Sequence, residues 1–416
     1  MAESITLILE SLRIVYDLFV EFWWLYLPPL LFFAWLFSFE NYTRLKYLAS
    51  LEWVLLDIKV PREINKSPKG MEQVFAALYG IFLGPVKWRE KFFKGKIPDW
   101  FSFEIAGTGG EMHFYVRTQT KYRNLVESQI YAQYPDAELT ETEDYLSSLP
   151  AFLPNDEYDL WCGEEVLSKE DAYPIRTYPE FEEKASGPDA IKRIDPVASL
   201  LETISSLEYK EYISVQLLIR PVGDDWVKNG QAVVDKLMGK KSKASEDWLT
   251  KAIFGVDKFL SGASSVKKEE KKEEREQLSS GKHDVLEAVE RSFTKLGFES
   301  GIRLVYIFPK GAFRMTHLVA MNGAFKQFAS PSLNSFKLNG KTTPPIKGLF
   351  YKQKAYARKV RMYKKLRGGL FVEKPVILTT EELATVYHFP DVSVRSPLIP
   401  RVEAKKGEPP AGLPIG

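Results

Sequence analysis

The stretch WFSFEIAGTGGEMHFYVRT, residues 100–118, decides the fold of this chain. It contains two runs rich in aromatic and β-branched residues, WFSFEIA (100–106) and MHFYVRT (112–118). The runs are separated by a segment that holds Gly107, Gly109 and Gly110. Because glycine adopts the positive φ angles of tight turns without steric cost, the pattern predicts a β-hairpin.

A strand and a helix are expected on either side of this hairpin. WVLLDIKV (53–60) has the composition of a strand, and residues 70–81 then carry apolar side chains at helical spacing. After the hairpin, residues 122–134 predict a helix that ends before Pro135 and leads to the short strand AELTE. The order β-α-β-β-α-β predicts a first ferredoxin-like (split βαβ) α+β domain at 49–150.

A second ferredoxin-like α+β unit is expected at 151–336, so the chain would hold a degenerate repeat. Its elements are a helix at 197–207, strand YISVQLLIRPV, a helix at 284–296, strand GIRLVYIF and a helix at 313–328. The segment 224–281 contains KKEEKKEERE, in which most like charges fall at i and i+4 and oppose helix formation. We expect a flexible charged insertion there, with a partner-binding arm as the alternative.

Near the N-terminus, FWWLYLPPLLFFAWLFSF (22–39) is an uncharged run of 18 residues, about 27 Å long as a helix. It predicts a transmembrane helix within an anchor at 1–48. The aromatic residues expected to contact the membrane are Trp23, Trp24, Tyr26 and Trp35. Basic residues are more frequent after the run than before it, which predicts a single-pass protein of the cell membrane with a cytoplasmic body. A buried core helix and a re-entrant hairpin are the alternatives.

Local charge singles out residues 337–374, which hold 12 Lys and Arg against one acid. A helix is expected at 350–366 within this segment. The candidate polyanion-binding residues are Lys352, Lys354, Arg358, Lys359, Arg361, Lys364, Lys365 and Arg367. Such a surface suits nucleic acid, anionic lipid, or the acidic stretch 136–189 of the same chain or of a second copy.

The end of the chain is expected to contain a basic helical region at 337–390 and a Pro-rich, linker-like tail at 391–416. TTEELATVYHF (379–389) predicts a helix, because Thr379 and Glu382 have the spacing of a capping box. Pro390 would stop that helix.

The distribution of reactive residues predicts no catalytic, cofactor or metal site. Cys162 is the only cysteine, and the four histidines are scattered along the chain. SFKLNGKTT (335–343) ends like a phosphate-binding loop, but it lacks the first glycine and is followed by two prolines. A polar turn is the better interpretation, and we expect no enzyme.

Two segments, GGEMHFYVRTQTKYRNLVESQIYAQYPDAEL (109–139) and LTTEELATVYHFP (378–390), resemble the membrane-anchored N-terminal region of bacterial type IV secretion and conjugation-like (DNA-transfer) ATPases. The resemblance covers much of residues 40–414. In the family that it resembles an ATPase domain follows this region, and this chain is expected to lack that domain. Since neither Walker motif is present, the resemblance implies a non-enzymatic scaffold or adaptor that docks a separate hexameric ATPase, or other secretion subunits, at the cytoplasmic membrane face. Homo-oligomers are left open. The alternative is a membrane-tethered nucleic-acid-binding protein that uses residues 337–374.

Overall fold

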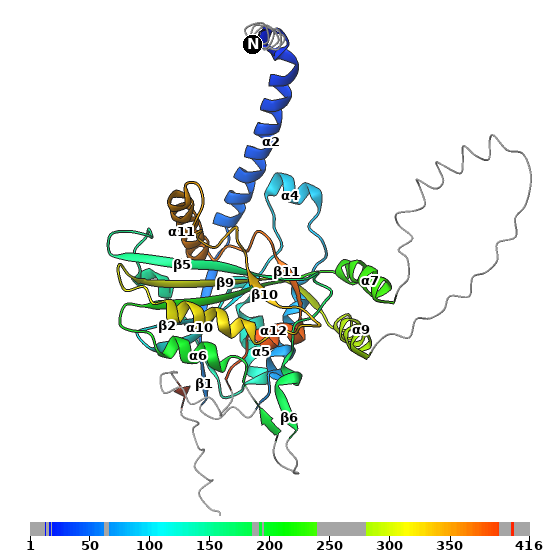
Figure 1. Cartoon of the computed structure of the whole chain (residues 1–416), viewed down its shortest axis with the longest axis vertical. Helices are drawn as coiled ribbons and strands as arrows, with labels where there is room; N and C mark the ends of the chain where they lie inside the picture. The colour runs from blue at the N-terminus through cyan, green and yellow to red at the C-terminus, as the bar shows by residue number, and fades with distance from the viewer. Residues whose placement is uncertain are drawn as a thin grey trace, which may run out of the picture. The chain divides into compact units, whose positions relative to one another are not determined.

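The computed structural model describes residues 13, 16–17, 19–61, 66–184, 191–193, 195–238, 280–390 and 401–402 (Figure 1). The contacts divide the chain into two compact units. One unit comprises Met1–Glu52 and Pro85–Asp99, and the other comprises Trp53–Gly84 and Trp100–Gly416.

The first unit contains helices α2 (Trp23–Ala49) and α4 (Trp88–Lys94). Helix α2 continues through Pro28 and Pro29. The rings of Phe39 and Phe92 lie 5.5 Å apart, and Thr43 Oγ1 is 3.3 Å from the Phe92 carbonyl oxygen. Gly95 ends α4 with a φ of +64°, and a side chain there would collide with the Thr43 backbone. Glycine therefore permits both the left-handed turn and the close approach of the two helices.

The sequence predicted a transmembrane helix in this unit. Most of the uncharged run, residues 23–39, does lie in α2. Within the described part of the chain, however, no helix combines the length and the apolar character that crossing a membrane requires.

The second unit is built on a ten-stranded sheet. Its strands are β1 (Trp53–Pro61), β2 (Phe101–Thr108), β3 (Glu111–Gln119), β4 (Glu138–Thr142), β5 (Tyr158–Leu167), β8 (Tyr212–Pro221), β9 (Gly297–Pro309), β10 (Phe336–Leu338), β11 (Val376–Thr379) and β12 (Arg401–Val402). All paired strands are antiparallel except β1 and β12, which are parallel. A separate two-stranded ribbon joins β6 (Glu182–Lys184) to β7 (Ile191–Arg193).

Strand pairing repeats along this sheet. The strands of residues 53–142 lie side by side in the order β4-β1-β3-β2. The strands of residues 158–338 lie side by side in the order β10-β5-β9-β8. Strands β2 and β8 pair from Phe101 with Ile219 to Thr108 with Tyr212, which joins the two halves. The fold is therefore mixed α and β with one large antiparallel sheet.

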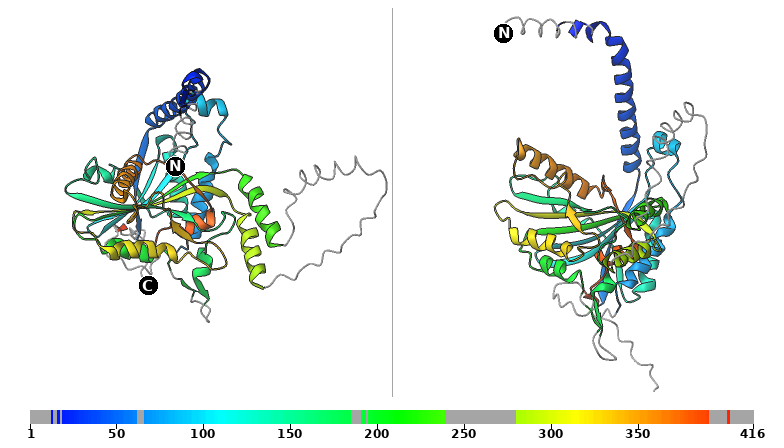
Figure 2. Two further views of the ribbon diagram at one scale, coloured as in Figure 1. Left: turned by 45° about the horizontal axis from the view of Figure 1, so that its top comes forward. Right: turned by 45° about the vertical axis from the view of Figure 1, so that its right-hand side comes forward.

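Helices cover both faces of the sheet. The α-helices described in this unit are α3 (Lys69–Leu78), α5 (Arg123–Gln133), α6 (Ala198–Ser205), α7 (Asp225–Leu237), α9 (Ser280–Ser292), α10 (Met315–Lys326), α11 (Tyr351–Arg367) and α12 (Thr380–Val386). Of these, α7 and α9 pack against each other in a cluster of their own. Figure 2 shows α11 on the face opposite α6 and α10.

The main core lies on the face covered by α3, α5, α6, α10 and α12. Alternate strand residues such as Phe101, Phe103 and Ile105 enter this core, because successive side chains of a strand point to opposite faces. On the other face a smaller cluster packs Met362 and Leu366 of α11 against the sheet. The rest of that second face holds a small apolar cluster of Leu55, Ala106 and Tyr115 and a row of polar residues.

Several sequence predictions can be compared directly with these elements. The order strand, helix, strand, strand, helix, strand is found over 53–142, and the capping box of Thr379 and Glu382 is confirmed. Strand β5 was missed, because its acidic sequence YDLWCGEEVL has little alternation. The region 337–390, predicted to be helical, also contains β11.

The predicted insertion and the predicted C-terminal tail lie largely outside the residues that the structure describes. Helices α7 and α9 occupy the two ends of the predicted insertion 224–281, and its middle, 239–279, lies outside the described residues. The predicted tail 391–416 is described only at 401–402, which form β12.

Candidate functional site

Helix α11 carries all eight residues predicted to bind a polyanion. Its buried residues Met362, Tyr363 and Leu366 pack against Leu160 and Val305 of the sheet. This apolar face orients the helix, so the basic residues are distributed between its flanks and its outer face.

Four of the eight basic residues serve the structure. The Lys359 ammonium lies 2.6 Å and 2.8 Å from the two Asp159 carboxylate oxygens, and Lys365 Nζ lies 2.9 Å from Glu373. Arg358 donates to the carbonyls of Gly340 and Thr343, at 2.7 Å and 2.6 Å. Arg367 donates to the carbonyls of Leu149 and Pro150, at 3.3 Å and 3.1 Å. These side chains fasten α11 to the loops around it.

The other four residues, Lys352, Lys354, Arg361 and Lys364, are exposed. The eight candidate residues therefore differ in exposure, and half of them direct their charge to solvent. A 17-residue helix that lies on a sheet must direct some of its side chains toward that sheet.

A cavity of about 170 Å³ lies beside α11. Its lining residues are Glu164, Asn339, Lys341, Thr342, Arg358, Arg361, Met362, Lys365, Glu373 and Lys374. Five of these are cationic and two are acidic, so the lining has an excess of three positive charges. A single phosphate or carboxylate group suits both the size and the charge of this cavity.

The Gly340-Lys341-Thr342 segment is part of this cavity. As expected from the sequence, it is a turn and does not open a helix. The Thr342 hydroxyl accepts from the Glu164 N–H at 3.1 Å and lies 3.1 Å from the Asn339 carbonyl. Lys341 is exposed, so its ammonium can reach an anion while the threonine holds the turn against β5.

A row of polar residues crosses the sheet on the face that α11 covers. Cross-strand pairing places them next to one another in the order Glu164, Arg303, Gln216, Glu104, Tyr115 and Asp57. Each of these residues lies on a different strand, and all are buried. Polar groups removed from water need partners within the protein, so this row is an extended internal network.

Arg303, like Gln216 and Glu104 of this network, has no exposed surface. Its guanidinium donates to Gln216 Oε1 at 2.9 Å, to Glu164 Oε1 at 3.3 Å and to the Leu370 carbonyl at 2.8 Å. Burial lowers the pKa of Arg303, whereas the Glu164 charge opposes that change. Arg303 thereby connects the sheet to the chain that follows α11.

Farther along this face, Tyr145 covers Glu104. The Tyr145 hydroxyl lies 2.7 Å from Glu104 Oε2 and 2.8 Å from Ser214 Oγ, and burial raises the pKa of Tyr145 well above its usual value. Arg117 donates to Glu104 at 3.2 Å and to Asp144 at 3.0 Å. Asp144, Tyr145 and Ser214 of this cluster line a second cavity, of about 520 Å³, together with Tyr209 and Tyr212.

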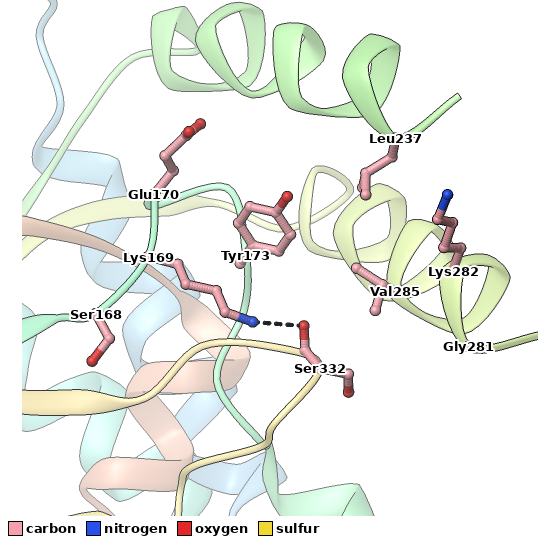
Figure 3. A pocket seen from close by; sticks show the side chains of 9 residues that line it. All are labelled: Ser168, Lys169, Glu170, Tyr173, Leu237, Gly281, Lys282, Val285 and Ser332. Carbon is pink, nitrogen blue, oxygen red and sulfur yellow. Dashed lines mark hydrogen bonds between the residues drawn. The ribbon is translucent and has the colours of Figure 1, made fainter. Parts of the chain in front are cut away.

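A third cavity lies between the 168–173 loop and the ends of α7 and α9 (Figure 3). Its volume is about 910 Å³, and Leu237 and Val285 are among its apolar lining residues. Lys169 donates to the Ser332 carbonyl at 2.9 Å and lies over the Tyr173 ring, so its charge is already engaged.

A smaller cavity of about 190 Å³ lies beside α12. Glu381 there is paired with Arg291 at 3.2 Å and with Lys295 at 3.3 Å. Glu382 accepts from the backbone N–H groups of Thr379 and Ile175, at 2.8 Å and 2.9 Å. Burial nevertheless raises the pKa of Glu382 to about 7. Both carboxylates therefore fix the start of α12.

The aromatic residues predicted to contact a membrane lie on α2. Trp23, Trp24 and Trp35 are exposed, and Trp35 stacks on Phe39 at 5.5 Å. Tyr26 is half-buried, because its ring stacks on Phe19 at 4.3 Å and its hydroxyl donates to the Phe19 carbonyl.

Sequence reasoning missed the buried network. Its one available signal was a charged residue inside an apolar strand, as at Glu104, Arg117 and Arg303. The partners themselves came from distant segments, which only the strand register brings together.

Comparison with characterised proteins found no match to this chain. A family model matches residues 40–400, which include the last part of α2, from Glu40 to Ala49, and all of the described sheet except β12. The chain therefore belongs to the family described as Domain of unknown function (DUF8128).

Proposed function

We propose that this protein is a non-enzymatic scaffold that associates with the cell membrane through α2 and docks a separate ATPase. The observation that carries the proposal is the exposure of Leu30, Leu31, Phe32 and Phe33, which is 60%, 57%, 55% and 67%. Consecutive helical residues are 100° apart, so these four side chains cover the whole circumference of α2. A helix that is apolar on every side favours the interior of a protein or a membrane over water.

Ion pairs of buried acids support a structural role for the second unit, here called the body. Glu164 pairs with Arg303, Glu104 with Arg117, and Glu381 with Arg291. Each pair gives a carboxylate that the fold removes from water a partner of opposite charge. These buried acids are therefore suited to holding strands and helices together.

We infer further that the body consists of two ferredoxin-like repeats. The antiparallel orders β4-β1-β3-β2 and β10-β5-β9-β8 support this, because each is the order of a split βαβ unit. Pairing of β2 with β8 would then fuse the repeats edge to edge and remove two exposed strand edges. Such a broad, rigid body suits a docking platform.

The proposed partner is a hexameric ATPase of a secretion or DNA-transfer machine. This rests on the resemblance of residues 109–139 and 378–390 to the region that precedes such motors. Arg44 and Lys46 near the end of α2, with Lys59 beyond it, favour a cytoplasmic body, because basic flanks remain on the cytoplasmic side.

Flotation of the full chain with lipid vesicles tests the role of α2. The chain should float, and Phe33→Asp combined with Trp35→Asp should remove most of it from the lipid fraction. Phe152→Asp is the matched control, since Phe152 is a large apolar residue of the other unit with 73% exposure. A wild-type chain that stays in the aqueous fraction would contradict the proposal.

Docking of a motor needs a separate experiment. Chemical cross-linking in native membranes, followed by mass spectrometry, should join the body to an ATPase subunit. If repeated experiments recover only cross-links within this chain or to itself, the adaptor role is wrong even if membrane association holds.

A second function, binding of a polyanion such as single-stranded nucleic acid, is favoured by the cationic cavity beside α11. The lining residues Lys341, Arg361 and Lys374 are exposed and basic, and Tyr356 is 57% exposed on the same helix. Phosphates would bind the cations while a base stacks on the tyrosine. The affinity should fall steeply as the salt concentration rises. An affinity that does not depend on salt concentration would exclude this function.

A further inference from the structure

The loop between β10 and α11 presents apolar side chains to solvent. Ile346, Leu349 and Phe350, here called the apolar tip, are 87%, 76% and 62% exposed. Three large apolar residues within five positions form a local concentration, which differs from the single exposed apolar residues found on most surfaces.

The backbone of the apolar tip adopts unusual conformations. Gly348 has a φ of +109°, and Phe350, the N-cap residue of α11, has a φ of +56°. A bulky residue rarely occupies the left-handed region, and N-cap positions usually hold a small polar residue. The chain therefore keeps an exposed phenylalanine where local stability would favour glycine, asparagine or serine, and backbone strain of this kind often accompanies function.

The charged residues next to the apolar tip in the sequence have one sign. Lys347, Lys352 and Lys354 are exposed, and the sequence from 337 to 372 contains no acid. Tyr351 is also partly exposed at the start of the helix. Lysines around a protruding group of aliphatic and aromatic side chains complement an anionic lipid surface, where the chains enter the acyl boundary and the ammonium groups meet phosphates.

We propose that the apolar tip inserts into the surface of an anionic bilayer and forms a second membrane contact, separate from α2. This inference rests on the proposed membrane association. It assigns Leu349 and Phe350 to the acyl boundary and assigns Lys347, Lys352 and Lys354 to the headgroups.

A fluorescent probe that responds to polarity tests this contact in the full chain. Leu349→Cys supplies the attachment point in lipid nanodiscs. The native Cys162 is buried, and burial raises the pKa of its thiol to about 12, so labelling selects the new cysteine. Phe152→Cys is the matched control, because it replaces an equally exposed apolar residue in a loop without the lysines.

The probe at 349 should shift its emission to shorter wavelength and brighten several-fold in discs that contain phosphatidylglycerol. It should change little in discs of phosphatidylcholine alone, and the probe at 152 should not respond to either. Equal emission at 349 in the two kinds of disc overturns the proposal. So does an equal response at 152.

Reversing the charge of the lysines next to the apolar tip tests the same proposal independently. Lys352→Glu combined with Lys354→Glu should abolish most of the change at 349, whereas Lys210→Glu combined with Lys282→Glu should not. An unchanged response after the first pair of substitutions contradicts the assignment of these lysines to headgroups.

The same preparation separates this inference from the proposed function. Retention of the chain in the discs reports on α2, whereas the emission at 349 reports on the apolar tip. If the chain leaves the discs, sedimentation with phosphatidylglycerol vesicles measures the tip alone. Loss of that binding on Leu349→Asp, but not on Phe152→Asp, would support the tip, and no binding at all would overturn it.

Discussion

Arg303 Nη2 lies 3.3 Å from Glu164 Oε1, and the two residues are direct cross-strand neighbours on β9 and β5. Both are buried, so the pair is removed from water near the centre of the face that α11 covers. Arg303 also reaches the carbonyls of Lys365 and Leu370. The Arg303 guanidinium, whose charge Glu164 balances, therefore helps to hold the end of α11 on the sheet.

Removing one member of this pair should be costly. Arg303→Met leaves the Glu164 carboxylate buried without its main partner and should lower the free energy of unfolding by about 3–5 kcal/mol. The double variant Arg303→Met, Glu164→Met should lose less than the single variant, since no uncompensated charge remains. Urea denaturation of the wild type, Arg303→Met, Glu164→Met and the double variant measures this coupling. Strictly additive losses would show that the two side chains act independently.

The pH dependence of stability should contain a contribution from Glu165. Burial raises the pKa of this carboxyl from 4.5 to about 7, although Lys326 opposes the change. Because the folded-state pKa is the higher one, the protonated group stabilises the fold below pH 4.5 and this stability is lost as the pH rises through 7. The loss is about 3 kcal/mol at most.

Glu165→Gln should therefore stabilise the protein at pH 8 and leave it unchanged near pH 4. Denaturation midpoints from pH 4 to pH 8 measure the difference between the two chains. Glu202→Gln, an exposed site on α6, controls for the removal of one charge. A constant difference between Glu165→Gln and wild type across this range would rule out the titration.

The basic residues of α11 should separate into two groups. Arg361→Glu and Lys364→Glu change exposed side chains, so they should weaken polyanion binding and reduce its salt dependence by about one counterion each, without loss of stability. Lys359→Glu places a second carboxylate beside Asp159, and should lower the free energy of unfolding by about 1–3 kcal/mol. Heparin affinity and urea denaturation of each variant distinguish the groups. Equal behaviour of all three variants would contradict this division.

Strain at Phe350 predicts a conflict between stability and membrane contact. Phe350→Gly removes the penalty of a left-handed φ, and should raise the free energy of unfolding by about 1 kcal/mol. The same change removes an apolar side chain and should reduce binding to anionic vesicles. Phe350→Leu is the control, because it keeps both the strain and an apolar side chain. A glycine variant that binds vesicles as well as wild type would remove Phe350 from the contact.

Local patterns in the sequence predicted much of the first half of the fold. The glycines between residues 106 and 111, the periodicity of α3 and α5, and the stop at Pro135 are all signals between near neighbours in the chain. They give the order of elements found over 53–142. Strand β5 escaped because Glu164 and Glu165 lie side by side and point to opposite faces of the sheet, where different partners surround them.

The sequence predicted which basic residues belong to the candidate site, but it did not predict which of them are paired and which are exposed. The sequence located the basic segment and its helix within one residue at each end. It could not show that Lys359 and Lys365 face acids contributed from elsewhere in the chain, such as Asp159 and Glu164, since those distances depend on the path of the chain.

By itself, the sequence determined the order of the main strands and helices over 53–142, the uncharged run of α2 and the excess of positive charge at 337–374, because each depends on residues close together in the chain. Only the tertiary structure decided that β2 and β8 join two similar halves, and that Glu164, Arg303, Gln216 and Glu104 form one buried row. The physical reason is strand register. A shift of one residue would turn each side chain to the opposite face, and register is set by the packing of the whole sheet.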